Sequence, residues 1–242
     1  MLRLSDSRNF SRTLAAIGLI VGPLLFVLGA LIDPAWDDDH AAYLAEVADG
    51  KGAYITAGVL GTLGSLFFIA GMIGVMRLLR HRRVTFGQFA AGLLTVGLIG
   101  LTAGFAFNAF DVAVADFDDR ETMVAFSESL EDSGALNAYF IAFFFGGIVL
   151  GSVLLAIALY RRRIVPIWSP ILLVVAIVVG FAGGEGKLLS ALSFLILAAA
   201  LAPLAMLIWS LSDDDWERWE LPLDREGARP EAEPPPPEPV RT

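Results

Sequence analysis

The sequence has no cysteine, only two histidines and few charged residues for its length of 242. The lack of cysteine excludes disulfides, thiolate metal sites and cysteine nucleophiles. His40 and His81 both lie in predicted loops, which argues against a haem held by two histidines within helices. The sequence also lacks a His-Glu-x-x-His pair, a Gly-rich phosphate loop and a Gly-x-Ser-x-Gly elbow, so it carries no motif of those enzyme classes.

Charge is scarce and unevenly distributed along the chain. Charged residues make up 18% of it, against about 25% in soluble domains, and 56% of residues are hydrophobic. With a mean hydropathy of +0.68, this composition predicts a polytopic membrane protein. The net charge of −9 comes from acidic loops and an acidic tail, and the preference for Arg over Lys is associated with GC-rich or salt-adapted prokaryotes.

Six apolar runs predict an all-α fold, a membrane bundle of six transmembrane helices. The clearest run, residues 54–76, is followed by an arginine-rich segment that ends at Arg83. Such a run can cross a bilayer core of about 30 Å at about 1.5 Å per residue. The runs contain no Asp, Glu, Lys, Arg or His, which argues against a proton-coupled pump or a voltage sensor. The predicted spans are residues 14–32, 54–76, 89–110, 136–160, 164–182 and 188–209.

The fifth run is the least regular, because Pro166 and Pro170 lie in its first turns. A helix that began at Pro170 would keep thirteen residues up to Ala182, too few for a full span. We favour an oblique helix that begins at Ile164 over a re-entrant segment, and whether this run spans fully stays open.

The basic residues predict that both termini are cytoplasmic. In that orientation the inner segments hold fourteen of the seventeen basic residues, and the outer loops hold Lys51, Arg120 and Lys187. We therefore predict an N-in, C-in protein of the cell (plasma) membrane, with residues 1–13 as a cytoplasmic leader. Residues 211–242 form an acidic, Pro-rich cytoplasmic tail, largely disordered after a short helix that begins near Ser212. On that helix, Trp216 and Trp219 are expected to lie on lipid headgroups.

Two outer loops are expected to contain short amphipathic helices. Acidic residues start the first, over residues 39–49, and Gly50 ends it. In the loop at residues 111–135, Met123, Phe126 and Leu130 follow helical spacing. An Ala-Tyr pair follows each loop, and the pattern of helix, loop, glycine, Ala-Tyr, helix and arginines occurs twice, which predicts an internal hairpin repeat.

The candidate ligand-binding residues lie at the outer ends of the third and fourth predicted helices. If those helices form an antiparallel pair, their polar groups lie at similar depth and could line a pocket under the outer loops. Helix capping and loop anchoring explain the same residues without a ligand. The candidates are Asn108, Asp111, Asn137 and Tyr139.

No metal site and no cofactor are predicted. Asp37, Asp38, Asp39 and His40 offer oxygen and nitrogen atoms, but the run lacks EF-hand spacing, and consecutive residues cannot all face one ion.

Pairs of small residues four positions apart allow close approach of helices in lipid. They serve packing within the bundle or a homodimer seam, and the sequence does not separate the two uses. The pairs are Gly18 with Gly22, Ala57 with Gly61, Gly100 with Gly104, and Gly147 with Gly151.

Residues 25–83 combine an apolar helix, an acidic loop reading Asp39-His40-Ala41-Ala42-Tyr43-Leu44, and a helix that closes in Met76-Arg77-Leu78-Leu79-Arg80. A later helix begins in Val165-Pro166-Ile167-Trp168. On these residues the chain resembles uncharacterised bacterial six-helix integral membrane proteins that are classed as domains of unknown function. The resemblance covers about residues 12–210 and implies a fold type without an activity.

Three functional hypotheses fit the sequence. The leading one is a non-catalytic accessory or regulatory subunit in the lipid bilayer, which pairs with itself as a homodimer or with a membrane-protein partner. The second is a small-molecule or lipid-binding carrier with a pocket beneath the outer loops. The third, ranked last, is a lipid enzyme that uses Asp111 and His40. No nucleic-acid partner is predicted.

Overall fold

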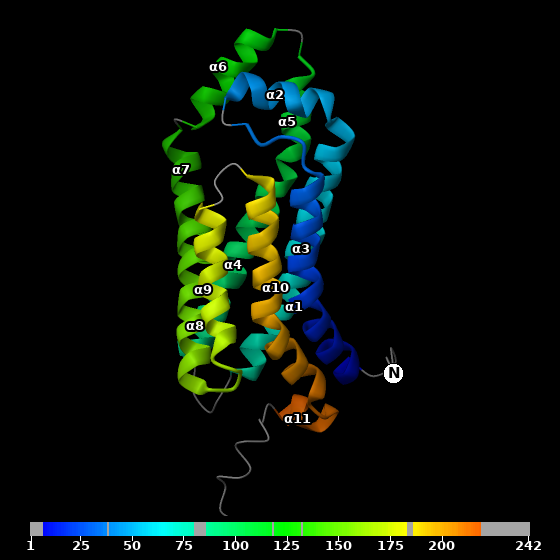
Figure 1. Ribbon diagram of the computed structural model, residues 1–242, viewed down its shortest axis with the longest axis vertical. Helices are drawn as coiled ribbons and strands as arrows, with labels where there is room; N and C mark the ends of the chain where they lie inside the picture. The colour runs from blue at the N-terminus through cyan, green and yellow to red at the C-terminus, as the bar shows by residue number, and fades with distance from the viewer. Residues whose placement is uncertain are drawn as a thin grey trace, which may run out of the picture.

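The computed structural model describes residues 7–37, 39–79, 86–117, 119–131, 133–182 and 186–218. Throughout these residues the regular structure is helical (Figure 1). The elements are α1 (Ser7–Ile32), α2 (His40–Asp49), α3 (Lys51–Leu78), α4 (Phe86–Ala106), α5 (Asn108–Ala115), α6 (Arg120–Glu131), α7 (Gly134–Phe140), the π-helix η1 (Ile141–Leu150), α8 (Gly151–Arg162), α9 (Trp168–Ala182), α10 (Lys187–Ser210) and α11 (Asp213–Arg218).

Five helical runs in the described part of the chain are long and apolar enough to cross a membrane. They are α1, α3, Phe86–Ala115, Gly134–Arg162 and α10. The remaining apolar helix, α9, has 15 residues, fewer than the roughly 20 that a span usually needs. It begins at Trp168 rather than at Ile164, after an irregular segment that contains Pro166. The lengths indicate a multi-pass membrane protein, and the count of six spans stays a prediction.

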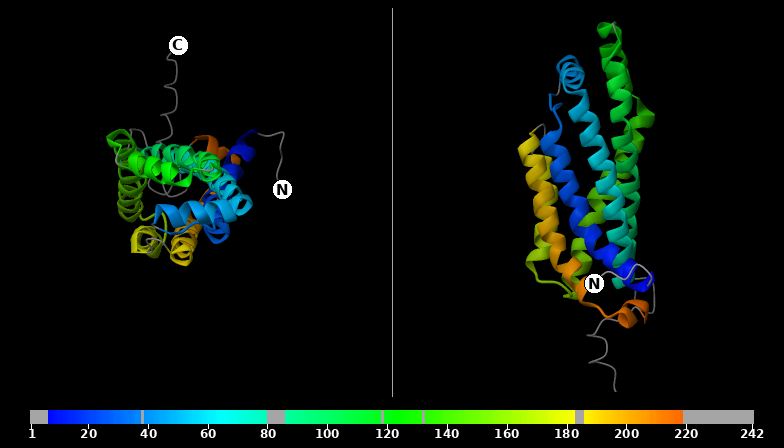
Figure 2. Two further views of the ribbon diagram at one scale, coloured as in Figure 1. Left: turned by 90° about the horizontal axis from the view of Figure 1, so that it is seen from above. Right: turned by 90° about the vertical axis from the view of Figure 1, so that its right-hand side faces the viewer.

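The long helices form a closed ring when viewed from above (Figure 2, left). Around this ring α1 packs between α3 and α10, and α3 packs on α4. Helix α4 contacts both η1 and α8, and α9 lies between α8 and α10. We call the end that carries α2 and α6 the loop half, and the end that carries α11 and the start of α1 the terminal half (Figure 1).

Glycines bring the helices of this ring into backbone contact. A Cβ atom added to Gly18 would lie 2.2 Å from the carbonyl oxygen of Phe67, so α1 and α3 touch there. A Cβ on Gly147 would lie 2.3 Å from the Cα atom of Gly97, so η1 and α4 touch as well. A Cβ on Gly104, in contrast, would meet no atom within 4 Å among those described. Packing within the bundle therefore accounts for Gly18 and Gly147.

The terminal half is filled by large aliphatic side chains. Leucines of α1, α4, α8, α9 and α10 are fully buried and belong to one hydrophobic core. They are Leu19, Leu94, Leu98, Leu155, Leu159, Leu173, Leu201 and Leu204. This core closes the ring at the end nearest to α11.

Two irregularities interrupt helices that the sequence predicts as regular. The third predicted helix breaks at Phe107 and then continues as α5, past the expected end at Phe110. The fourth contains η1, a π-helical segment that lies directly on α4. The uncharged apolar runs predicted both helices but not these changes, because helix breaks and π-turns depend on close packing with neighbours.

Two short helices lie in the two long loops where the sequence predicts them. Asp39 caps α2 by accepting a hydrogen bond from the Ala42 N–H at 2.9 Å, and the helix ends at Gly50 as predicted. Helix α6 covers Met123, Phe126 and Leu130 in the second loop. The arrangement fits the proposed hairpin repeat, which itself stays a prediction.

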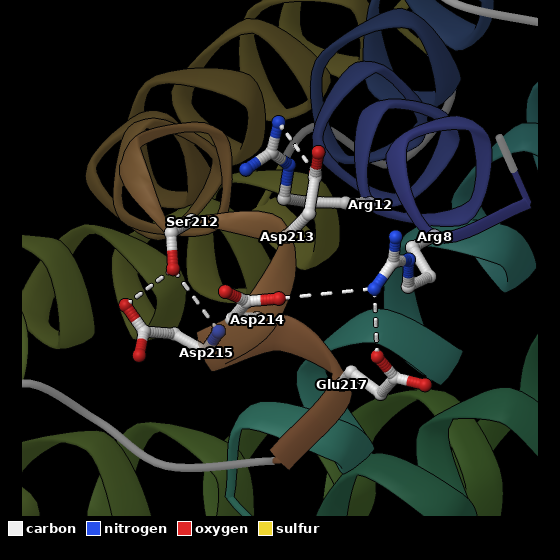
Figure 3. A network of polar contacts seen from close by, with 7 residues as sticks. All are labelled: Arg8, Arg12, Ser212, Asp213, Asp214, Asp215 and Glu217. Carbon is white, nitrogen blue, oxygen red and sulfur yellow. Dashed lines mark hydrogen bonds and ion pairs between the residues drawn. The ribbon is translucent and has the colours of Figure 1, made fainter.

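The first and last described helices are joined at the terminal end. The leader predicted for residues 1–13 is helical from Ser7, as part of α1. Arg8 lies 3.0 Å from Glu217 and 3.7 Å from Asp214, and Arg12 lies 3.1 Å from Asp213 (Figure 3). Both described ends of the chain therefore lie on the same side of the bundle.

Helix α11 begins at the predicted cap and docks through its tryptophan. The Ser212 hydroxyl lies 2.7 Å from the Asp215 carboxylate and accepts from the Asp215 N–H at 3.0 Å (Figure 3). The expectation that Trp216 lies on lipid headgroups is wrong. Its side chain is buried, it donates to Ser11 at 3.0 Å, and Arg77 lies over its ring. Trp219, the Pro-rich tail and Arg80–Arg83 are outside the described residues.

Candidate functional site

A cavity of about 420 Å³ lies inside the loop half of the ring. Its walls are mostly apolar and come from α1, α3, α4, η1, α8, α9 and α10. Aromatic side chains dominate these walls: Phe26, Phe105, Phe144, Phe181 and Phe194. At its deep end the cavity meets the leucine core, since Leu197 lines it while Leu201, one turn further along α10, is fully buried.

Aromatic contacts connect the cavity walls. The ring of Phe26 stacks on Phe105 at 5.9 Å and lies 5.1 Å from Phe194. Across the seam between η1 and α9, Phe181 lies 5.9 Å from Phe144 and 5.8 Å from Phe145. The cavity thus has a preformed aromatic lining of the kind that holds apolar ligands.

Polar groups gather at the loop end of the cavity and form what we call the polar cap: Asp33, Tyr43, Tyr54, Asn108 and Asp111. All except Asp111 line the cavity directly. The Asp111 carboxylate accepts hydrogen bonds from the Tyr54 hydroxyl at 2.7 Å and the Tyr43 hydroxyl at 3.3 Å. The two hydroxyls also lie within hydrogen-bond distance of each other, and because Tyr54 gives its proton to Asp111, the Tyr43 proton is shared between Asp111 and the Tyr54 oxygen. Three elements, α2, α3 and α5, thus meet in one network.

Local sequence features place these tyrosines. Tyr43 lies on the first turn of α2, which Asp39 caps, and Tyr54 lies on the first turn of α3, just after Gly50. The rings meet edge to face at 6.2 Å. Burial raises the pKa of Tyr43 above its ordinary range, so its hydroxyl stays protonated and available as a donor.

The segment between α1 and α2 folds over the cavity beside this network. Asp33 accepts a hydrogen bond from the Ala35 N–H at 3.1 Å, and the Trp36 indole donates to the Asp33 carbonyl oxygen at 3.0 Å. The backbone N–H of Trp36 donates to the Glu46 carboxylate at 2.9 Å. Burial raises the pKa of Asp33 to about 6; the Ala35 N–H opposes the rise and the nearby Glu46 charge adds to it.

The four sequence-predicted residues separate into two pairs. Asn108 and Asp111 belong to the polar cap, and Asn108 donates to the Tyr54 carbonyl oxygen at 3.4 Å. Asn137 and Tyr139 are exposed on α7. The Tyr139 hydroxyl donates to the Gly100 carbonyl oxygen at 3.1 Å and its ring packs on Phe143, which ties α7 and η1 to α4. A ligand-binding role of Asn137 and Tyr139 stays a prediction.

Sequence reasoning missed Asp33, Tyr43 and Tyr54 as parts of a site. A usable signal was present for Tyr54, because the Ala-Tyr pair that follows Gly50 recurs as Ala138-Tyr139 after Gly134. Asp33 and Tyr43 gave no comparable signal, since a carboxylate after a span and a tyrosine in a loop helix are ordinary features. Across the described residues, no group of three or more His, Cys, Asp or Glu side chains lies in position to hold a metal ion.

A helical bundle with apolar, span-length helices and a capped internal cavity defines the class: an integral membrane protein with a candidate binding pocket. The family follows from the sequence comparison. The family model DUF4386, a domain of unknown function, matches residues 14–212, and the chain belongs to this family. Comparisons with curated proteins and with solved structures returned no match.

Proposed function

We propose that the protein binds a small, largely apolar molecule with a polar end group in the cavity of its loop half. The observation that carries this proposal is a cavity of about 420 Å³ with aromatic walls and polar groups at one end. Ligand pockets typically measure about 300–1,000 Å³ and combine apolar walls with a few placed polar groups. The cavity matches that description in size and in lining.

The polar cap determines the kind of end group that the cavity accepts. The hydroxyls of Tyr43 and Tyr54 are held by Asp111, and the Asn108 amide lies beside them. These groups both donate and accept hydrogen bonds, so a neutral or cationic end group satisfies them better than an anion. The acidic side chains Asp33 and Asp111 also disfavour an anion by like-charge repulsion.

The leucine core supports storage or carriage rather than conduction. It fills the ring below the cavity with fully buried side chains such as Leu155 and Leu201. A molecule in the cavity therefore meets a packed barrier on the side of α11. With the orientation that the basic residues favour, the cap faces outward in the cell membrane and both termini face the cytoplasm.

Native mass spectrometry of protein released from lipid particles of its own membrane tests the proposal. We expect the wild type to carry a reproducible additional mass of small-molecule size. Gly180→Phe places a phenyl ring in the cavity, because Gly180 lines it, and is expected to abolish that mass. Gly104→Phe is the matched control, since a Cβ at Gly104 meets no described atom within 4 Å.

A second pair of variants tests the polar cap. Asp111→Ala removes the acceptor for both tyrosine hydroxyls and is expected to reduce the bound mass. Asp116→Ala, five residues further along the chain, removes a carboxylate that pairs with Lys51 instead and is expected to leave the mass unchanged. A wild type without a small-molecule mass, or with the same mass in Gly180→Phe, overturns the proposal. A stoichiometric second polypeptide would favour the accessory-subunit hypothesis, which stays a prediction.

A further inference from the structure

A second hollow lies on the other side of the cavity wall formed by α4 and α5. It is a groove of about 240 Å³ between α3 and the junction of α4 with α5. Its lining is almost entirely apolar, and Val59, one of the lining residues, is 52% exposed. The groove lies on the two span-length runs that contain α3 and α4–α5. In a bilayer the medium at such a surface is lipid hydrocarbon.

Two side chains, Phe105 and Asn108, line both the groove and the cavity. They close the wall by resting on glycines of α3. A Cβ added to Gly61 would lie 2.5 Å from the ring of Phe105, and one added to Gly58 would lie 2.9 Å from the Cβ of Asn108. At these positions the same two side chains therefore face the cavity on one side and the groove on the other.

The helix that carries this wall is broken between the two side chains. The Phe107 N–H donates to the Gly104 carbonyl oxygen at 3.0 Å, and the Phe110 N–H donates to the Phe107 carbonyl oxygen at 2.8 Å. These bonds span three residues rather than four, which tightens the turn, and such turns within helices often mark hinges. Phe105 belongs to α4 and Asn108 to α5, so the two halves of the wall lie on opposite sides of the break.

The hydrogen bond that holds Asn108 in the wall is weak. Its amide lies 3.4 Å from the Tyr54 carbonyl oxygen, beyond the usual 2.7–3.2 Å of N–H···O bonds. An incoming polar end group can replace this bond at small cost. Phe105 is held by ring contact with Phe26 and by the fit against Gly61, both of which a hydrocarbon chain can replace.

We propose that Phe105 and Asn108 form a lateral portal through which a single hydrocarbon chain of a membrane amphiphile enters the cavity from the bilayer. The inference rests on the proposed binding function and names its ligand class: a chain-bearing lipid whose polar end stays at the cap. The groove is the outer vestibule of the portal. The break at Phe107 lets the wall open without moving the leucine core.

A reversible lock tests the portal in the full chain, which contains no natural cysteine. The double variant Gly58→Cys/Asn108→Cys places two thiols across the wall. Their Cβ atoms would begin 2.9 Å apart, so helix separation of roughly 0.6 Å reaches the lower end of disulfide geometry. The oxidised protein is locked, and the same protein after reduction is its own control.

Trp36 reports the arrival of a chain, because it lines the cavity. The protein is placed in vesicles of unbrominated phosphatidylcholine, and a monoacylglycerol with a dibrominated acyl chain and a neutral end group is added as the probe. The measured quantity is tryptophan fluorescence. Subtracting the fluorescence of the same protein with Trp36→Phe isolates the contribution of Trp36 from that of the other tryptophans. We expect quenching of Trp36 in the reduced protein, loss of that quenching in the oxidised protein, and recovery when reductant is added.

Two single variants keep the test informative if the double variant folds poorly. Phe105→Ala removes half of the wall and is expected to accelerate quenching. Phe89→Ala, at a side chain on α4 that is 60% exposed and lines neither hollow, is the matched control. Equal quenching of Trp36 in the oxidised and reduced proteins overturns the portal. The portal is also overturned if Phe181→Ala, at the seam between η1 and α9, accelerates quenching and Phe105→Ala does not.

The outcome separates the portal from the binding function. A wild type whose Trp36 is not quenched also overturns the portal, while the additional mass and its loss in Gly180→Phe continue to report on binding by themselves. Loss of both signals overturns the binding function together with the portal.

Discussion

The two halves of the bundle are packed by different means. In the terminal half, fully buried leucines from α1, α4, α8, α9 and α10 fill the centre of the ring. In the loop half, the same helices surround a cavity of about 420 Å³, and a network of tyrosines, an asparagine and carboxylates covers it. Dense packing stabilises a single arrangement, whereas a lined void under a polar cap leaves room for a second molecule.

The largest expected contrast lies on α10, where Leu201 belongs to the core and Leu197 lines the cavity. We expect Leu201→Ala to destabilise the protein by about 2–5 kcal/mol, because a buried leucine loses its contacts and leaves a new void. Leu197→Ala should cost less, since part of that side chain already faces empty space. Unfolding in one detergent, followed by near-ultraviolet circular dichroism, measures both. Equal losses would contradict the difference between the two halves.

A slightly smaller effect is expected where two helix backbones touch. Gly147→Ala adds a Cβ only 2.3 Å from the Gly97 Cα, so η1 and α4 must separate, at a cost of about 1–3 kcal/mol. Gly104→Ala adds the same atom where no described atom lies within 4 Å, and it is expected to leave stability nearly unchanged. Thermal unfolding of the two variants beside wild type gives the comparison, and a neutral Gly147→Ala would rule out close contact of these helices.

The polar cap is expected to make stability depend on pH. The pKa of the Asp33 carboxyl is about 6 in the folded protein and 3.8 in the reference state. Because the folded state binds this proton more tightly, its contribution is complete below about pH 4 and is lost as pH rises through about 6. The Tm of wild type should therefore fall across this window more steeply than that of Asp33→Asn. Parallel Tm curves for the two proteins would show that Asp33 is not buried as described.

The smallest effect is expected at the exposed ion pairs that tie α11 to α1. The Arg8 side chain is 44% exposed and its partners Asp214 and Glu217 more so. Such surface pairs usually contribute about 0.2–1 kcal/mol, so Arg8→Ala should lower the Tm slightly and less at high salt. Trp216→Ala, which empties a buried position on α11, provides the contrast. A larger fall in Tm for Arg8→Ala than for Trp216→Ala would contradict the expectation that the exposed ion pairs contribute less than the buried tryptophan.

Much of the fold was predictable from residue patterns. Uncharged apolar runs correspond to α1, α3 and α10, because length and hydropathy decide whether a helix can cross a bilayer. The caps Asp39 and Ser212 were predictable as well, since they act on neighbouring backbone groups. The family assignment over residues 14–212 confirms the resemblance to a family of unknown function.

The candidate site was predictable only in part. Asn108 and Asp111 stand out because polar residues at the end of an apolar run are conspicuous. Tyr43 and Tyr54 do not, because their role depends on α2 folding back over the ring to meet α5. Trp216 shows the same limit: an amphipathic side chain suits a membrane interface, yet contacts with α1 and Arg77 bury it.

The sequence by itself determined the helical class, the approximate boundaries of the apolar segments and the short capped helices, because each depends on residues close together in the chain. Only the tertiary structure decided where the ring is filled and where it is hollow. The cavity, the polar cap and the shared wall at Phe105 and Asn108 arise from contacts between residues far apart in sequence. Periodicity and composition describe one segment at a time, and a pocket is a property of how several segments meet.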